Sequence, residues 1–123
     1  MTTRILYVDD EADLREVAVM SLELDPAFEV RDCTSGTAAL AIAGDWQPAV
    51  ILLDMMMPGM DGPATFRALC EQPETAAIPV IFVTARTQAR DVEALMALGA
   101  RGVIAKPFDP MTLAGQVRAL LDG

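Results

Sequence analysis

Four of the five apolar segments of the sequence end in side chains that could do chemistry. Asp9 and Asp10 follow the first segment, Asp54 ends the third, Thr84 ends the fourth and Lys106 follows the fifth. Carboxylates, a hydroxyl group and one cation are together what a divalent metal ion and a phosphoryl group require. The pattern therefore indicates phosphoryl chemistry, provided that the fold brings the five residues to one place.

Each of these residues also has an ordinary structural explanation. Acidic residues after a strand commonly cap the next helix, and capping is the favoured explanation for Asp9 and Asp10 taken alone. Asp54 differs, because an ionisable carboxyl at the end of the most apolar segment is costly to bury without compensation. Thr84 alone is ordinary strand composition, and a lysine before a proline is usually solvated. Only the joint placement of the five favours a functional site.

The apolar pattern predicts the elements that must position these residues. Segments rich in valine, isoleucine and leucine predict strands at Arg4–Val8, Phe28–Cys33, Ala49–Leu53, Val80–Val83 and Val103–Ala105. Helical spacing between and after them predicts apolar faces formed by Leu14, Val17, Ala18, Ser21 and Leu22, by Val92, Leu95 and Met96, and by Leu113, Val117, Leu120 and Leu121. Ser35 is the expected cap of the second helix, Pro63 suits the first turn of the third, and Asp109 with Pro110 is expected to open the last.

The alternation of strands and helices predicts an α/β fold with a parallel sheet between two helix layers. The carboxyl ends of parallel strands share one edge of the sheet, where such folds place ligand sites. Only the second strand ends without an obviously committed group, as expected for the outer strand of a sheet of order 2-1-3-4-5. The first and third strands, which carry Asp9, Asp10 and Asp54, are then neighbours.

Composition limits the class of protein. A chain of 123 residues, 53% of them apolar, predicts one domain over residues 1–123. A net charge of −9 would repel nucleic acid and anionic membranes, so neither is an expected direct partner. No segment is long enough to span a membrane and acidic residues follow the start too closely for a secretory signal, so a cytoplasmic protein is expected. Without histidine the familiar zinc sites cannot form, and Cys33 and Cys70 are expected to be reduced core thiols.

Four motifs, ILYVDDE, VILLDMMMPGMDG, PVIFVTAR and GARGVIAKPF, resemble those of the receiver domain of two-component response regulators, in the same order and at the same spacing. The resemblance covers nearly the whole chain and implies a flavodoxin-like three-layer sandwich with five helices. It implies that Asp54 is the phosphoacceptor and that Thr84 and Lys106 contact the phosphoryl oxygens. The metal site it implies consists of Asp9, Asp10, Asp54 and Met56. Pro58, Gly59 and Gly62 match the loop after the acceptor, and Pro107 matches a proline that is usually cis.

Chemistry argues for the same roles. Crowded carboxylates resist simultaneous ionisation, so Mg²⁺, or Mn²⁺ as a substitute, is expected to bind there and keep Asp9, Asp10 and Asp54 in their charged forms. Asp54 can then attack phosphorus and form an acyl phosphate. Because the chain has no histidine, the phosphohistidine donor is expected to be a separate sensor histidine kinase or histidine phosphotransfer protein.

Two departures from the family bear on the output. Val103 stands where the family usually has an aromatic residue whose ring moves during switching, so the Thr84 loop and Arg86 are expected to carry most of the change, with a smaller shift of the fourth helix. Met56 and Arg86 line the approach of hydrolytic water in the family, although exposed loop positions explain them equally well. The expected partner surface includes Arg90, Glu93, Arg101, Gln116 and Arg118.

Other functions stay open at this point. A receiver-shaped binding module that is never phosphorylated should have lost one or more site groups, and none is lost here. An aspartate-nucleophile phosphatase should have a second acid two residues after the nucleophile, where this chain has Met56. A signalling switch rather than an enzyme is therefore expected. A complete single-domain regulator and a receiver cut from a longer protein both agree with the sequence.

Overall fold

The computed structural model describes residues 2–122, and its sheet has five parallel strands in the order β2-β1-β3-β4-β5. The strands are β1 (Thr3–Val8), β2 (Phe28–Cys33), β3 (Val50–Asp54), β4 (Val80–Thr84) and β5 (Gly102–Ala105). The predicted α/β class and strand order are confirmed, and each strand boundary lies within one residue of its prediction. Asp54 is the last residue of β3 and Thr84 the last residue of β4.

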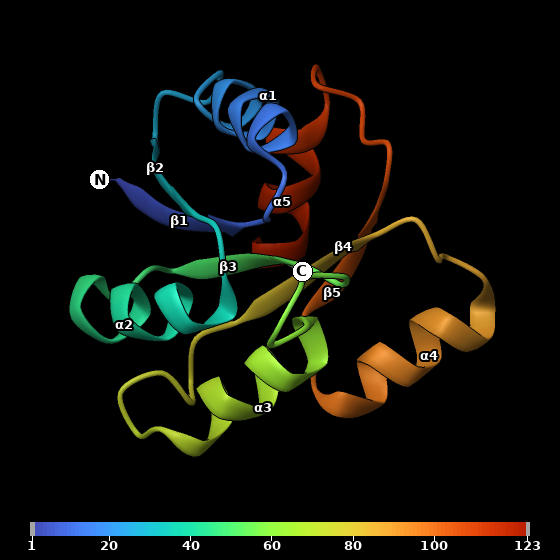
Figure 1. Cartoon of the computed structure of the whole chain (residues 1–123). Helices are drawn as coiled ribbons and strands as arrows, with labels where there is room; N and C mark the ends of the chain where they lie inside the picture. The colour runs from blue at the N-terminus through green and yellow to red at the C-terminus, as the bar shows by residue number, and fades with distance from the viewer. Residues whose placement is uncertain (1, 123) are drawn as a thin grey trace.

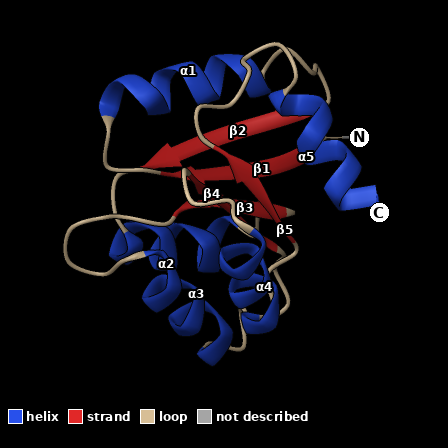
Figure 2. Cartoon of the chain, turned by 90° about the vertical axis from the view of Figure 1, so that its right-hand side faces the viewer, coloured by secondary structure: helices blue, strands red, loops and turns tan. Residues whose placement is uncertain are grey.

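Helices cover both faces of the sheet. They are α1 (Ala12–Leu22), α2 (Gly36–Trp46), α3 (Gly62–Glu71), α4 (Ala89–Leu98) and α5 (Leu113–Asp122). Figure 1 and the perpendicular view in Figure 2 place α1 and α5 on one face and α2, α3 and α4 on the other. Two hydrophobic clusters, one on each face, form the core.

The middle of the sheet is fully covered. Every residue of β3 is buried, because the strand pairs with β1 and β4 along its edges and is covered by helices on both faces. The register pairs Val8 of β1 with Leu53, and Asp54 with Val83 of β4. This register brings the carboxyl ends of β1, β3 and β4 to the same edge.

The starts of the helices follow local hydrogen bonding. The Ser35 hydroxyl accepts a hydrogen bond from the Ala38 N–H and caps α2, as predicted. Asp61 caps α3 in the same way, and Pro63 lies in its first turn. The prediction for the last helix is wrong in position. The carboxylate of Asp109 accepts from the Met111 N–H within a turn over residues 110–112, and α5 begins only at Leu113.

Parts of two predicted apolar faces are exposed. In α1, Ala18, Ser21 and Leu22 are buried, whereas Val17 is 41% exposed. In α4 only Leu95 is buried, and Met96 is 44% exposed. Helical spacing defines a face, but neighbouring elements cover only part of it. No helix within residues 2–122 is long and apolar enough to cross a membrane.

Two further predictions are corrected. Cys33 is buried, but Cys70 is exposed on α3, so it is not a core thiol. Arg118 does not face the α4–β5 side of α5, because its guanidinium donates to Asp25 over 2.8 Å and lies over the ring of Phe28. It therefore ties α5 to the segment between α1 and β2.

Candidate functional site

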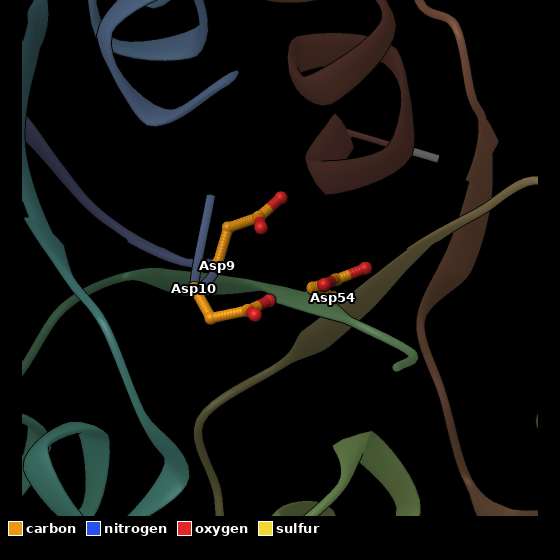
Figure 3. A group of neighbouring side chains, drawn as sticks. All are labelled: Asp9, Asp10 and Asp54. Atoms are coloured by element: carbon orange, nitrogen blue, oxygen red, sulfur yellow. The ribbon is translucent and has the colours of Figure 1, made fainter. Parts of the chain in front are cut away.

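Three aspartates meet where β1 and β3 end (Figure 3). Asp9 and Asp10 follow β1, their side chains diverge from the end of that strand, and Asp54 extends from the end of β3. One carboxylate oxygen from each lies within 4.8 Å of the other two. Asp9 and Asp54 are buried, while Asp10 is exposed. Three carboxylate donors around one point, one of them open to solvent, suit a hard divalent cation such as Mg²⁺.

Lys106 joins this group from the far edge of the sheet. Its ammonium donates to Asp54 Oδ1 over 2.6 Å and to Asp9 Oδ2 over 3.2 Å. The main-chain N–H of Lys106 donates to the carbonyl of Thr84, which holds the segment after β5 against the end of β4. The bond from Lys106 to Pro107 is cis, as the resemblance implies.

Burial and charge act in opposite directions on this pair. Burial raises the pKa of Asp54 above its usual value, the hydrogen bond from Lys106 opposes this, and the nearby charge of Asp9 adds to it. Burial by itself would lower the pKa of Lys106, but its hydrogen bond to Asp54 and the charges of Asp54 and Asp9 outweigh it, so that this pKa is raised. The site is therefore short of positive charge, which a divalent cation would supply.

Asp9 is held by donors that sequence reasoning missed. Its Oδ1 accepts from the Glu11 N–H at 3.0 Å, and its Oδ2 accepts from the hydroxyl of Tyr7 at 3.2 Å. Its main-chain carbonyl accepts from Arg15, which also pairs with Asp32 at the end of β2. The outer strand thus supports the site indirectly. Strand alternation contained the signal for Tyr7, because a residue two positions before Asp9 shares its face.

Thr84 lies at the end of β4, one residue beyond the partner of Asp54 in the register. Its side chain is buried, and its Oγ1 accepts a hydrogen bond from the Arg86 N–H at 3.0 Å. Because the hydroxyl oxygen acts as an acceptor in this bond, its own proton stays available for donation to another group.

The loop after Asp54 combines an exposed side chain with a tight turn. Met56 projects outward with 68% exposure, while its main-chain N–H bonds to Asp54 and favours the charged carboxylate. Gly62 donates to the carbonyl of Met55 over 3.0 Å and closes the loop. A Cβ atom on Gly62 would lie 2.6 Å from the main-chain oxygen of Asp54, so only glycine fits without movement of the backbone.

Val103 lies on the far side of the sheet from α1 and α5. It is half-buried, pairs in register with Phe82 and packs against the cluster under α2, α3 and α4. Its side chain therefore belongs to the core on the α4 side.

Comparisons with known proteins identify relatives of this arrangement. The pattern of the response regulator receiver domain matches residues 5–118. The chain is 37% identical over 121 residues to the DNA-binding response regulator MtrA of Mycobacterium tuberculosis, covering 98% of this chain and 51% of MtrA. It is 41% identical over 122 residues to the response regulator PleD of Caulobacter vibrioides, covering 98% of this chain and 26% of PleD. The chain thus spans about half the length of MtrA and about a quarter of PleD.

The fold has close counterparts among solved structures. The chemotaxis response regulator CheY4 of Vibrio cholerae superposes with a TM-score of 0.89 and 30% identity, covering 98% of this chain and 99% of CheY4.

Proposed function

We propose that Asp54 of this chain, which belongs to the response regulator receiver domain family, accepts a phosphoryl group from a phosphohistidine of a partner protein. One observation supports this most directly. The buried carboxylate of Asp54 lies at the end of the central strand, within 2.6 Å of the only lysine of the chain and beside two further carboxylates. This is the surrounding that a carboxylate nucleophile and a transferred phosphoryl group need.

The proposed transfer forms one bond and breaks one. An oxygen of the Asp54 carboxylate attacks phosphorus, and the bond from phosphorus to the donor's imidazole nitrogen breaks with its electron pair left on nitrogen. The Lys106 ammonium, already at the carboxylate, pairs with a phosphoryl oxygen, and the Thr84 hydroxyl donates its free proton to another. Later attack of water on phosphorus would release phosphate and restore the carboxylate.

We assign the proposed metal site to Asp9, Asp10, Asp54 and Met56. The carboxylates supply oxygen ligands. From Met56 the ligand would be the main-chain carbonyl oxygen, because the thioether sulfur is too soft a ligand for this cation. When bound, Mg²⁺, or Mn²⁺ in its place, supplies positive charge that offsets the carboxylates and the phosphoryl oxygens. The chain's own contribution is to hold the three carboxylates together and to keep Lys106 beside Asp54.

The proposed donor is a sensor histidine kinase or a histidine phosphotransfer protein, since this chain has no histidine. We propose that residues 1–123 act as one switch rather than as an enzyme, and that a downstream protein reads the phosphorylated state. We also propose that these residues do not themselves contact nucleic acid, because their net charge of −9 would repel it.

Intact-mass spectrometry after incubation with acetyl phosphate and Mg²⁺ tests the proposal. The parent should gain one phosphoryl group, and Asp54→Asn should gain none. Asp45→Asn, which changes an exposed acid of α2, is the matched control and should be labelled like the parent. Undiminished labelling of Asp54→Asn would remove Asp54 as the acceptor, and an unlabelled parent would favour a binding module that is not phosphorylated.

A further inference from the structure

Tyr7 places a single polar atom in an otherwise apolar part of the core. It is the only tyrosine of the chain, lies on β1 and is fully buried. Its ring packs in the cluster between the sheet and α1 and α5, where phenylalanine would fill the same space apart from the hydroxyl oxygen. A buried hydroxyl is costly unless it is hydrogen-bonded, and this one donates to Asp9 Oδ2 over 3.2 Å.

The same oxygen of Asp9 has a second donor. Lys106 Nζ also lies 3.2 Å from Asp9 Oδ2, while its distance to Asp54 Oδ1 is 2.6 Å. Lys106 is therefore shared between two carboxylates, and its shorter contact is with Asp54. Tyr7 donates to Asp9 alone. Asp9 has no exposed surface, so water cannot readily take the place of a lost donor.

Phosphorylation would change the balance between these two donors. Once Asp54 carries a phosphoryl group as an acyl phosphate, the carboxylate has lost its formal charge, and Lys106 is drawn to the negative phosphoryl oxygens. We propose that Tyr7 is a positioning residue that keeps the Asp9 carboxylate hydrogen-bonded when Lys106 turns to the phosphoryl group. This inference rests on the proposed phosphorylation of Asp54 and adds a residue to the switch. The hydroxyl lowers the free energy of the phosphorylated state by keeping a hydrogen-bond donor at Asp9 Oδ2, the oxygen from which Lys106 withdraws.

Tyr7→Phe isolates the hydroxyl, since it keeps the ring and its packing. Beryllofluoride, which mimics a phosphoryl group on a carboxylate, should bind this variant about tenfold more weakly than the parent in the presence of Mg²⁺, the effect expected for one lost hydrogen bond to a buried charge. Because Lys106 is the only lysine, [¹⁵N]lysine labelling gives one side-chain ammonium signal, and its shift during the titration reports both binding and the movement of Lys106.

A second measurement separates positioning from general damage to the site. Mg²⁺ alone leaves Asp54 a carboxylate that still holds Lys106 beside Asp9, so the affinity of Tyr7→Phe for Mg²⁺ alone should stay within about twofold of the parent. Thr75→Val is the matched control. It removes another buried hydroxyl, that of a residue after α3, which donates to the carbonyl of Leu69 within α3, and it should lower thermal stability without changing either affinity.

The outcomes are distinct. Equal beryllofluoride affinity for Tyr7→Phe and the parent would overturn the inference, and so would an equal loss of Mg²⁺ and beryllofluoride affinity, which would mean that the hydroxyl only maintains the pocket. A parent that neither binds beryllofluoride nor accepts phosphate at Asp54 would overturn the proposed function and this inference with it.

Discussion

Lys106 Nζ lies 2.6 Å from Asp54 Oδ1, so the only lysine of the chain forms an ion pair with the proposed acceptor before any phosphoryl group arrives. The two residues are 52 positions apart in the sequence. They meet because β3 and β5 both flank β4 in the parallel sheet and end at the same edge of it. The ammonium needs only a short movement to reach a phosphoryl oxygen on Asp54. Such preorganised charge stabilises developing negative charge without a large rearrangement.

Asp10 is the residue of choice for testing the metal site, because it is the exposed carboxylate of the three. Asp10→Asn should weaken Mg²⁺ binding about tenfold or more, since the neutral amide loses the charge that attracts a hard cation. Isothermal titration calorimetry measures this. Asp13→Asn, which changes an exposed acid in the first turn of α1, should bind like the parent. Equal affinities for parent and Asp10→Asn would exclude Asp10 as a ligand.

Thr84 should couple the site to the loop before α4. Its hydroxyl now accepts from the Arg86 N–H, and donation to a phosphoryl oxygen would change the geometry of that turn. With beryllofluoride, the amide chemical shifts of the loop should change most and those of α4 and β5 less, because Val103 has no large ring to move. Thr84→Ala should lose most of this response, whereas Thr87→Ala, in the same loop, should keep it. A full response in Thr84→Ala, or a parent whose α4 and β5 amides do not respond, would refute this account.

Gly62 should be required for the loop beside the acceptor. Gly62→Ala would force a Cβ atom against the main chain of Asp54 and Met55, and we expect the free energy of unfolding to fall by about 1–3 kcal/mol, as for other overpacked sites. Chemical denaturation measures the change. Gly44→Ala, within α2 and with free space around its Cβ, should instead raise stability by about 0.5–1 kcal/mol. Equal stability of Gly62→Ala and the parent would show that the backbone there adjusts freely.

The two thiols should differ in reactivity. Burial raises the pKa of Cys33 to about 11, so below that pH it stays largely protonated, and the thiol is a much weaker nucleophile than the thiolate. Cys70 is exposed. At pH 8, Ellman's reagent should therefore modify one thiol rapidly, and Cys70→Ser should remove that fast phase. A fast phase that survives in Cys70→Ser would show that Cys33 is accessible.

Sequence patterns were sufficient to predict the strands of the sheet and the residues that gather at its functional edge. A run such as VILLD has the composition of a buried parallel strand, and the carboxyl ends of such strands meet at one edge whatever the loops do. For this reason the meeting of Asp9, Asp10, Asp54 and Lys106 at one edge followed from local patterns. Exposure did not follow in the same way, as Val17, Met96 and Cys70 show.

Tertiary structure decided which donors surround each carboxylate. Sequence placed Tyr7 in an apolar strand, but only the packed fold shows that its hydroxyl and the ammonium of Lys106 share one oxygen of Asp9. Likewise, only the fold directs Arg118 to Asp25 instead of to the α4 side of α5. Periodicity determines the side of an element on which a residue lies, because that depends on the backbone alone. The partner of a long polar side chain depends on distances between elements far apart in the chain, which are set when the helices pack on the sheet.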